Sequence, residues 1–366
     1  MRIIVSKDEM VGKLSNIQNI VEKRNTMPIL SHLLLDAGKQ GSSIVATDLD
    51  TALKEPLQAK VEKEGRICIP ARKIFEIVRE VEGEILCEAI DDQWLRVKAG
   101  ASNFRLACLS AQEFPAWPGM EDVQEIALPS KVLAEIIAKA VYAAGESDTR
   151  YTLNGLLFHL LADGKATVVG TDGHRLALIS RTIGGGVGEE KKLIIPRKAA
   201  TELVRLVEKS DGEIKVRVGK NHVLFRIGEM EFLTRLVEGT YPNYEQVIPT
   251  GNDKKISVKR EVFAKTIRRV AIMSRERSNA VRVDLGQDLL TVVSSNPDLG
   301  EATDEMAISY SGEAISLGFN AKYVLDILDA MSSENVIMEF QSSLSPVLIR
   351  EEGDQDYLCV VMPMRI

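Results

Sequence analysis

Apolar residues along this chain recur in two spacings, one typical of helices and one typical of strands. The segments 5–21, 128–144 and 258–274 each follow an apolar stretch and a polar capping residue. Each then carries apolar residues three or four positions apart, as Met10, Leu14 and Ile17 do in the first segment. This spacing places the apolar side chains on one face of a helix, so we predict an amphipathic helix in all three segments.

Short apolar runs between these helices predict strands, and three of them lead into a second set of helices. Such junctions occur at 69–78, 195–204 and 319–328. The strand runs are brief and are separated by Gly, Asp, Asn and Ser, as strands joined by turns are. We therefore predict six helices in all, at 7–24, 72–80, 131–139, 197–209, 259–269 and 320–329.

The same landmarks return three times along the chain. Ala46, Gly170 and Ser294 begin matching turn segments that are 124 residues apart at both steps, and EFPAWP at 113–118 resembles the start of TYPNYEQVIP at 240–249. Repetition at a fixed period indicates tandem copies of one folding unit. We predict an α+β fold of three pseudo-equivalent domains, at 1–120, 121–247 and 248–366, each of them a strand, a helix and three strands repeated twice.

Length and composition fit several domains of a cytoplasmic protein. The 366 residues exceed the size at which one hydrophobic core usually stops growing. No apolar run approaches the ~18 residues of a membrane span, and MRIIVSKDEM does not resemble a signal peptide. Four scattered cysteines without C-x-x-C spacing indicate reduced core residues; they are Cys68, Cys87, Cys108 and Cys359.

One cluster resembles a catalytic site, namely Thr171-Asp172-Gly173-His174-Arg175. It contains a base, a carboxylate that could orient the base, and a cation. The other two copies of this segment carry Leu49-Asp50 and Pro297-Asp298 instead, so we interpret it as a structural turn with side chains left for binding. The pair Asp48 and Asp50 lacks a third metal ligand at supporting spacing. We expect no catalytic site, no metal and no cofactor.

Charge is divided unevenly between the predicted helices and the rest of the chain. The six helices hold 19 basic and 11 acidic residues, whereas the remainder holds 27 basic and 42 acidic residues. A basic surface shared by repeated helices attracts the phosphate backbone of nucleic acid without reading its sequence. We therefore expect a basic helical face on a protein whose net charge is −7.

The chain resembles a known family along its whole length, from Met1 to Ile366. The motifs that carry the resemblance are TMPILSHLLL (26–35), TDLD (47–50), IPARK (69–73), RYTLNGLLF (150–158), TDGHRLAL (171–178), IPRK (195–198), KYVLD (322–326) and VVMPMRI (360–366). They are similar to those of the bacterial DNA polymerase III beta subunit, the replicative sliding clamp. Three similar domains per chain also suit a ring closed by twofold pairing.

The resemblance implies a non-catalytic processivity factor that acts as a homodimeric ring, with helices inside and sheets outside. Such a ring encircles duplex DNA regardless of sequence, slides along it and is opened by an ATP-driven clamp loader. A peptide-binding pocket tethers the replicative DNA polymerase and other proteins that carry a clamp-binding motif. The main alternative from the sequence is a three-domain protein-binding scaffold that does not act on DNA, and an enzyme of unknown type comes third.

The resemblance also implies three sets of site residues. The DNA-facing set is Arg24, Arg72, Ser147, Tyr151, Thr152, Arg197 and Lys198. The dimer interface pairs Phe104 and Leu106 with Ile272 and Met273 on the third domain's helix, and sets Lys73 opposite Asp298, Glu301, Asp304 and Glu305. The partner-peptide pocket is Leu153, Thr171, Gly173, His174, Arg175, Leu176, Pro242, Val247, Leu344, Pro346, Val360, Val361, Met362, Pro363, Met364, Arg365 and Ile366.

The last five residues are unusually apolar for the end of a chain. Pro363 has no N–H to donate to a sheet, so it should end the preceding strand, in which Val360 and Val361 fit a core. Flexible methionines suit a groove that accepts several partners. We predict that residues 362–366 form a binding surface, with His174 and Arg175 at its polar rim.

Overall fold

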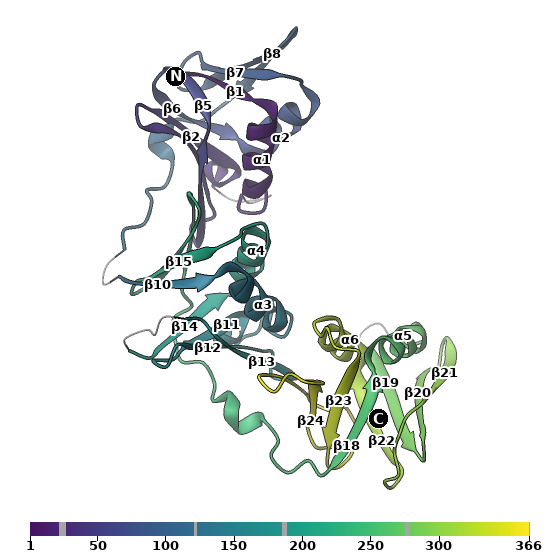
Figure 1. Ribbon diagram of the computed structural model, residues 1–366. Helices are drawn as coiled ribbons and strands as arrows, with labels where there is room; N and C mark the ends of the chain where they lie inside the picture. Colours follow the sequence, from purple (N-terminus) through teal and green to yellow (C-terminus); the bar gives the residue numbers. More distant parts are fainter. Residues whose placement is uncertain (22–26, 121–122, 185–188, 275–277, 366) are drawn as a thin grey trace. The chain divides into compact units, whose positions relative to one another are not determined.

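The computed structural model describes residues 1–21, 27–120, 123–184, 189–274 and 278–365 (Figure 1). The chain divides into two compact units. Unit 1 comprises Met1–Lys131 and Arg205–Leu236, and unit 2 comprises Val132–Val204 and Val237–Ile366. The second predicted domain is shared between them, because its strands join sheets of both of its neighbours.

The first third of the chain contains two α-helices and nine strands. In order these are β1 (Arg2–Ser6), α1 (Lys7–Ile17), β2 (His32–Gly38), β3 (Gly41–Thr47), β4 (Thr51–Leu57), β5 (Ala59–Lys63), β6 (Gly65–Pro70), α2 (Ala71–Glu80), β7 (Glu84–Ala89), β8 (Trp94–Ala99) and β9 (Ser102–Ala107). Two short 3-10 turns, η1 (Pro28–Ser31) and η2 (Ala111–Glu113), lie before β2 and after β9.

The other two thirds repeat this order. The second contains β10 (Gln124–Pro129), α3 (Ser130–Val141), η3 (Tyr151–Asn154), β11 (Gly155–Leu160), β12 (Lys165–Thr171), β13 (Arg175–Thr182), β14 (Lys191–Pro196), α4 (Arg197–Val207), β15 (Glu213–Val218), β16 (His222–Ile227) and β17 (Met230–Arg235). The third contains η4 (Tyr244–Val247), β18 (Lys254–Lys259), α5 (Arg260–Ala271), β19 (Ala280–Gly286), β20 (Leu289–Asn296), β21 (Gly300–Ala307), β22 (Ile315–Asn320), α6 (Ala321–Asp329), β23 (Asn335–Phe340), β24 (Val347–Glu351) and β25 (Tyr357–Val361).

The predicted pattern of a strand, a helix and three strands, repeated twice in each domain, is confirmed, with β5 as an additional strand. The predicted helix at 7–24 is too long. It ends at Ile17 with Gln18 as its C-cap, and the residues from 22 to 24 lie outside the described ranges. Asn16 and Asn19 explain the early end, because asparagine hydrogen-bonds nearby backbone and favours turns over helix interiors.

Unit 1 contains two antiparallel sheets. One has the order β5-β1-β7-β8-β9 and the other the order β10-β15-β16-β17-β4-β3-β2-β6. The larger sheet is continuous across the first two thirds of the chain because β17 pairs with β4, which sets Phe232 opposite Leu53. This pairing has no signal in the local sequence pattern of either strand.

Unit 2 repeats the arrangement with a sheet in the order β14-β11-β12-β13-β25-β24-β23-β18 and a second in the order β21-β20-β19-β22. Here β13 pairs with β25, which sets Leu176 opposite Val360. The second and third domains are therefore joined by main-chain hydrogen bonds as well as by side chains.

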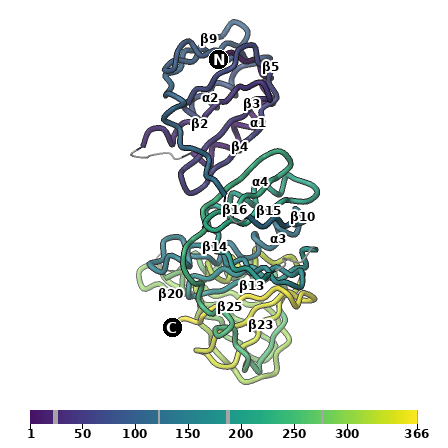
Figure 2. The backbone as a smooth tube through the Cα atoms, turned by 90° about the vertical axis from the view of Figure 1, so that its left-hand side faces the viewer, coloured from purple at the N-terminus to yellow at the C-terminus, as the bar shows by residue number. Residues whose placement is uncertain are grey.

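Pairs of helices cover the sheets, as Figures 1 and 2 show for α1 and α2. Met10 and Leu14 of α1 and Ile74 and Val78 of α2 are completely buried, so the predicted amphipathic faces do form the core. All four cysteines are free and buried, as predicted. Burial raises the pKa of the Cys68, Cys87 and Cys108 thiols to about 12 and that of Cys359 to about 11.

Candidate functional site

The segment from Thr171 to Arg175 is a tight turn between β12 and β13. The Thr171 hydroxyl donates to the Arg175 carbonyl at 2.6 Å, and Asp172 Oδ1 accepts from the main-chain N–H of His174 at 2.9 Å. Gly173 has a φ of +84°, which a glycine adopts without strain. The predicted structural role of this segment is confirmed.

The first domain has the same turn with other residues in it. Thr47 Oγ1 donates to the Thr51 carbonyl at 2.9 Å, and Asp48 Oδ1 accepts from the N–H of Asp50 at 3.2 Å. Leu49, the counterpart of Gly173, has a φ of +78°, which is unusual for leucine. The two turns share only the threonine and the first aspartate, so the remaining positions are open to function.

Arg175 lies in the interior, contrary to its predicted place at the rim of the groove. Its exposed fraction is 6%, because three acceptors surround the guanidinium. Nε donates to Asp172 Oδ2 at 3.1 Å, Nη1 to Asp326 Oδ2 at 2.6 Å and Nη2 to the Tyr142 carbonyl at 2.6 Å. The guanidinium also lies over the Tyr323 ring, 4.5 Å from its centroid. Arg175 therefore holds the turn and α6 together by its hydrogen bonds, and its guanidinium is not exposed to a partner.

His174 contacts the chain's last residues. Its carbonyl accepts from the N–H of Met362 at 2.8 Å, and its ring stacks on Tyr323 with the centroids 6.3 Å apart. His174 and Tyr323 line a cavity of about 320 Å³ together with Asn320 and the tail from Met362 to Arg365. The predicted association of His174 with the tail is therefore present.

The tail also borders a second cavity, of about 360 Å³, lined by Leu344, Met364 and Gly318 among others. The Met364 N–H donates to the Gly318 carbonyl at 2.8 Å, which holds the tail against β22. Leu344 is 59% exposed and Met362 is 41% exposed. The tail thus presents apolar side chains on a main chain that is hydrogen-bonded on both sides.

An apolar cluster lies at the junction of β13 and β25. It contains three predicted pocket residues, Leu153, Leu176 and Val360, together with Tyr241. Val360 and Val361 are 2% and 0% exposed, as expected of core residues, and β25 ends at Val361 ahead of Pro363, as predicted.

The other predicted pocket residues lie on segments beside this cluster. Val247 is 48% exposed at the end of η4, where Tyr244 and Ile248 pack on the cluster. Pro242 is exposed next to buried Tyr241, and Pro346 is half-buried just before β24. Ile366 lies outside the described residues.

Four of the predicted DNA-facing residues come together between α3 and α4. Ser147 and Tyr151 are exposed on the α3–β11 connection, with Thr152 half-buried beside them. Arg197, the first residue of α4, donates to the Ala144 carbonyl at 2.7 Å and contacts Glu146 at 3.1 Å, which brings it to the same connection.

The remaining DNA-facing predictions lie at the starts of helices or outside the described ranges. Lys198 is exposed on α4, and Arg72 is exposed as the second residue of α2. Arg24 lies outside the described residues.

The same α3–β11 connection carries a charge pair that fixes its shape. Arg150 donates from Nε and Nη2 to the carboxylate of Asp148, at 2.9 and 2.8 Å. These hydrogen bonds from Arg150 lower the pKa of Asp148 to about 2. The carboxylate therefore stays ionised, and keeps these hydrogen bonds, at acidic pH where an ordinary aspartate becomes protonated.

Two of the predicted dimer residues lie at a sheet edge, and the other three lie on or just after helices. Phe104 and Leu106 are on β9, an outer strand of the five-stranded sheet, and Leu106 is already buried within its own sheet. Ile272 and Met273 follow α5, which ends at Ala271, so they are not within the helix as expected; Ile272 is its C-cap. Ile272 is 76% exposed, and Met273 is half-buried near Gly300 at the start of β21. Lys73 is exposed on α2 and pairs with Glu76.

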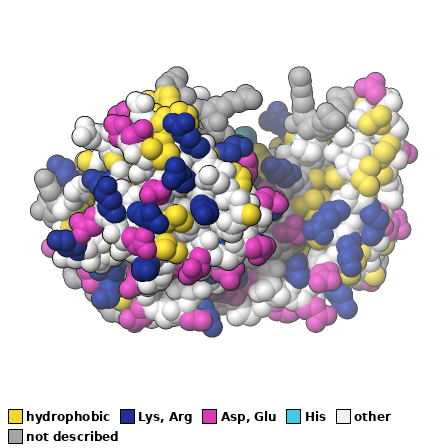
Figure 3. Space-filling view, turned by 90° about the horizontal axis from the view of Figure 1, so that it is seen from above, with side chains coloured by type: hydrophobic (Ala, Val, Ile, Leu, Met, Phe, Trp, Pro, Cys, Tyr) yellow, Lys and Arg dark blue, Asp and Glu magenta, His cyan; other side chains and the backbone are white. Residues whose placement is uncertain are grey.

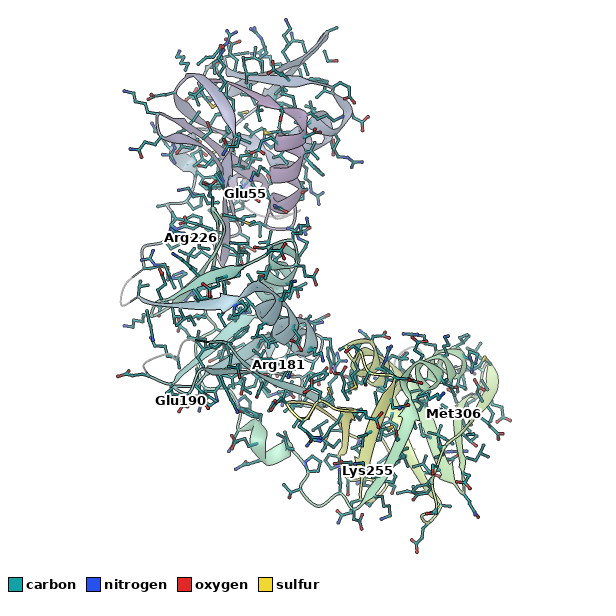
Figure 4. All side chains as sticks on the ribbon, in the orientation of Figure 1. Glu55, Arg181, Glu190, Arg226, Lys255 and Met306 are labelled. Carbon is teal, nitrogen blue, oxygen red and sulfur yellow. The ribbon has the colours of Figure 1, made fainter. Side chains whose placement is uncertain are left out.

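A polar network that was not predicted from the sequence joins α3 to the β24–β25 hairpin in unit 2. Arg181 of β13, labelled in Figure 4, contacts Glu135 at 2.7 Å and Asp354 at 2.6 Å. Lys139 pairs with buried Glu351 at 2.8 Å. Burial opposes ionisation of Asp354, but the contact with Arg181 lowers the pKa of this carboxyl. Tyr323 and Asp326 were also missed, although their three-residue spacing in KYVLD places them on one helix face.

Within the described ranges, no three His, Cys, Asp or Glu side chains group closely enough to hold a metal ion. Nor does any described helix have the length and apolar character needed to cross a membrane.

Sequence models of three successive domains match the chain. The N-terminal domain of the DNA polymerase III beta subunit matches residues 1–118, the central domain matches 127–243 and the C-terminal domain matches 245–365. The chain belongs to the DNA polymerase III beta subunit family. The three-domain fold expected from the repeat, and the sliding-clamp fold that the resemblance implied, are thus confirmed. As a beta subunit, the chain is a processivity clamp of DNA polymerase III with no catalytic role of its own.

Full-length relatives agree with the family models. The chain is 34% identical to the beta sliding clamp of Pseudomonas putida over 368 residues and 33% identical to that of Escherichia coli over 373 residues, with all of each chain covered. It is also similar to the crystal structure of the DNA polymerase III subunit beta sliding clamp from Bartonella birtlesii bound to griselimycin, with a TM-score of 0.95, 36% identity and full coverage of both chains. The Bacillus subtilis sliding clamp gives a TM-score of 0.93 at 26% identity, covering 100% of this chain and 99% of that one.

Proposed function

We propose that two copies of this chain join head to tail into a ring that encircles duplex DNA. The observation that carries this proposal is a pair of outer strands, β9 and β21, at the ends of two separate sheets. Outer strands present unpaired main-chain N–H and carbonyl groups, which a matching strand of another chain satisfies. Joining β9 of one copy to β21 of the next uses each edge once and closes a ring of two.

The side chains at these edges are complementary. β9 carries Arg105, whereas β21 carries Glu301, Asp304 and Glu305. Ile272, which lies close to β21 through Met273, is the most exposed large apolar side chain among the described residues. Burial of such side chains drives association, and the opposite charges favour the head-to-tail orientation of the two copies.

For DNA contact we propose the exposed residues at the starts of α2 and α4 and on the α3–β11 connection. Basic and polar side chains contact phosphate without reading base sequence. On the face seen in Figure 3, Lys and Arg are interspersed with Asp and Glu. We expect each phosphate contact to be weak and replaceable, as sliding requires, with a shallow salt dependence of only a few released counterions.

For partner binding we propose the surface formed by His174, Leu344 and residues 362–366, together with the apolar cluster at β13 and β25. Short segments with two or three large apolar side chains would bind there, as the replicative polymerase, the clamp loader and other clamp-binding proteins present them. Exposed methionines on a fixed main chain adapt to several such segments. We place the whole assembly in the cytoplasm.

We further propose domain boundaries near residues 120 and 248. The gaps between the three family matches, at 119–126 and at 244, support these positions.

Retention on DNA tests the ring. The chain is loaded by a clamp loader onto nicked circular plasmid, the plasmid is linearised in half of the sample, and both halves are gel-filtered. A ring stays on the circle and is lost from the free ends. Equal retention on both forms would exclude encirclement, and absence from both would favour a scaffold that does not act on DNA.

A further inference from the structure

A groove in unit 1 is lined by residues of β2, β3, β4 and β6 and by the segment that follows η2. Its cavity of about 470 Å³ has an apolar part formed by Leu34, Val45, Phe114 and Trp117. Three charged side chains complete its wall; they are Asp36, Lys54 and Arg66. None of the residues predicted from the sequence to bind a partner lies here.

The strand registers show that this groove corresponds to the apolar cluster of unit 2. In unit 2, one row across the sheet reads Ile194, Leu157, Val169, Leu178 and Leu358. The matching row in unit 1 reads Cys68, Leu34, Val45, Lys54 and Glu231. The two rows are alike through their first three positions. The last two are leucines in unit 2 and a lysine and a glutamate in unit 1.

The segments above the two rows also correspond. Phe114 and Pro115 stand where unit 2 has Tyr241 and Pro242, and each aromatic ring packs on its apolar row. Three positions further on, Trp117 lines the groove of unit 1, where unit 2 has Tyr244. Trp117 is half-buried, so it retains surface for contact with another molecule.

We propose that this groove is a second docking site, for an extended peptide that carries a large apolar side chain next to a carboxylate. The apolar side chain would fit between Val45 and Trp117. The proposal extends the partner pocket proposed for unit 2, on which it rests through the correspondence of the two rows. Trp and Tyr are enriched among the few residues that contribute most of the binding energy of an interface.

The charge of the groove selects an acidic partner. Its wall holds two cations and one carboxylate, and Arg66 is paired with Asp36 at 3.1 Å. Glu231, which lies opposite Lys54 across the sheet, contacts Arg226 at 2.6 Å (Arg226 is labelled in Figure 4). The exposed Lys54 therefore remains the cation best placed to meet a carboxylate of the peptide.

The unit 1 site should bind such a peptide about tenfold more weakly than the unit 2 site. Two leucines of the unit 2 row are replaced by charged side chains, so less apolar surface is buried on binding, and a loss of about 1.4 kcal/mol corresponds to a tenfold change in Kd.

Trp117 gives a local signal for the test, since the chain has one other tryptophan, Trp94. Trp94→Phe keeps a ring beneath Arg105, which lies 4.0 Å from the centroid of the Trp94 ring. The full-length Trp94→Phe chain is titrated with the synthetic peptide Gly-Leu-Asp-Phe-Leu-Gly while Trp117 emission is recorded. We expect a saturable shift.

Charge exchange identifies the contact. Adding Lys54→Glu should raise the Kd of the peptide at least tenfold. A peptide with lysine in place of aspartate should recover binding to that variant. Lys60→Glu, a charge change on β5 outside the groove, should leave the titration unchanged. The proposal is overturned if the peptide does not change Trp117 emission, or if Lys54→Glu and Lys60→Glu change the Kd equally.

A second readout separates this inference from the proposed partner pocket. Fluorescence anisotropy of the labelled peptide is measured on the full-length chain and on Met364→Asp. Suppose that anisotropy shows peptide binding, that Met364→Asp abolishes this binding, and that Trp117 emission does not change. The unit 2 pocket is then supported and the unit 1 site is rejected. If the Trp117 shift persists in Met364→Asp, the unit 1 site binds independently, as proposed.

Discussion

Arg175 of β13 and Asp326 of α6 are joined by a hydrogen bond of 2.6 Å between Nη1 and Oδ2, so that a cation of the second domain is neutralised by a carboxylate of the third. Asp172, at the turn that precedes β13, accepts from the same guanidinium. A buried arginine thus links the α6 helix to the turn that holds His174 beside the tail.

Replacing Arg175 by Ala should destabilise unit 2 by about 3–5 kcal/mol, because two carboxylates lose their buried cation. Asp326→Ala should lower the free energy of unfolding by less, since Asp172 still neutralises Arg175. The free energy of unfolding from urea titration measures both. Asp329→Asn on the same helix is the control: its pairing with Arg268 is solvent-exposed, so about 0–1 kcal/mol is expected. Equal costs for Arg175→Ala and Asp329→Asn would show that the buried contact is unimportant.

Ile272→Ala with Met273→Ala should weaken dimerisation. Each truncation of a side chain buried in the interface costs about 2 kcal/mol or more, hence at least roughly 30-fold in the dissociation constant. Sedimentation velocity at dilute protein should show folded monomers. Val262→Ala, which truncates an exposed residue of α5, should leave the dimer intact. A dimer that persists in the double variant would place the interface elsewhere.

Deleting residues 362–366 should abolish binding of polymerase and loader peptides with only a small loss of stability. The truncation removes the main-chain hydrogen bonds from Met362 and Met364, each worth about 0.5–1.5 kcal/mol. Peptide anisotropy and thermal melting measure the two effects. The double variant with Met362→Ala and Met364→Ala keeps the main-chain hydrogen bonds. It should therefore weaken peptide binding without lowering the melting temperature. Retained peptide binding, or general unfolding, would show that the tail is structural.

The four thiols should be inert in the folded chain. With a pKa of about 12, only about one Cys87 in ten thousand is a thiolate at pH 8, and Cys359 is also completely buried. A disulfide reagent at pH 8 should therefore react only after unfolding, and then with all four thiols counted from the sequence. Rapid modification of native protein would mean that a core strand opens readily.

The Asp148–Arg150 contact should resist acid. A carboxyl whose pKa is lowered to about 2 contributes stability above its unfolded pKa near 3.8 and loses this contribution as the pH falls through about 2. NMR titration of the Asp148 carboxyl should place its midpoint there, and Arg150→Gln should return it towards 3.8. A midpoint near 3.8 in the unaltered chain would show that the hydrogen bonds are absent in solution.

The repeat was predictable from the sequence because each domain spaces its apolar residues in the same way. Met10 and Leu14 have counterparts in the other two opening helices, and each lies in a core. The turn at Thr171 was predictable for a related reason, since Thr47 repeats the same hydrogen bonds. Local pattern and local chemistry suffice for such features.

Contacts between domains were not predictable from local patterns. The pairings of β4 with β17 and of β13 with β25 join strands that are far apart in the sequence, and a strand's apolar pattern does not identify its neighbour. The burial of Arg175 was missed for the same reason, because Asp326, its partner, belongs to the third domain.

The central position of β25 has a consequence for how the protein is made. β13 lies beside β25 in the middle of its sheet, yet β25 is synthesised only after all of the elements from β14 to β24. During synthesis β13 is therefore an open edge, able to pair with the wrong strand. The first domain meets a delay of similar length, since β4 waits for β17. The growing chain thus needs β25 to complete a sheet whose first strand, β11, begins at Gly155.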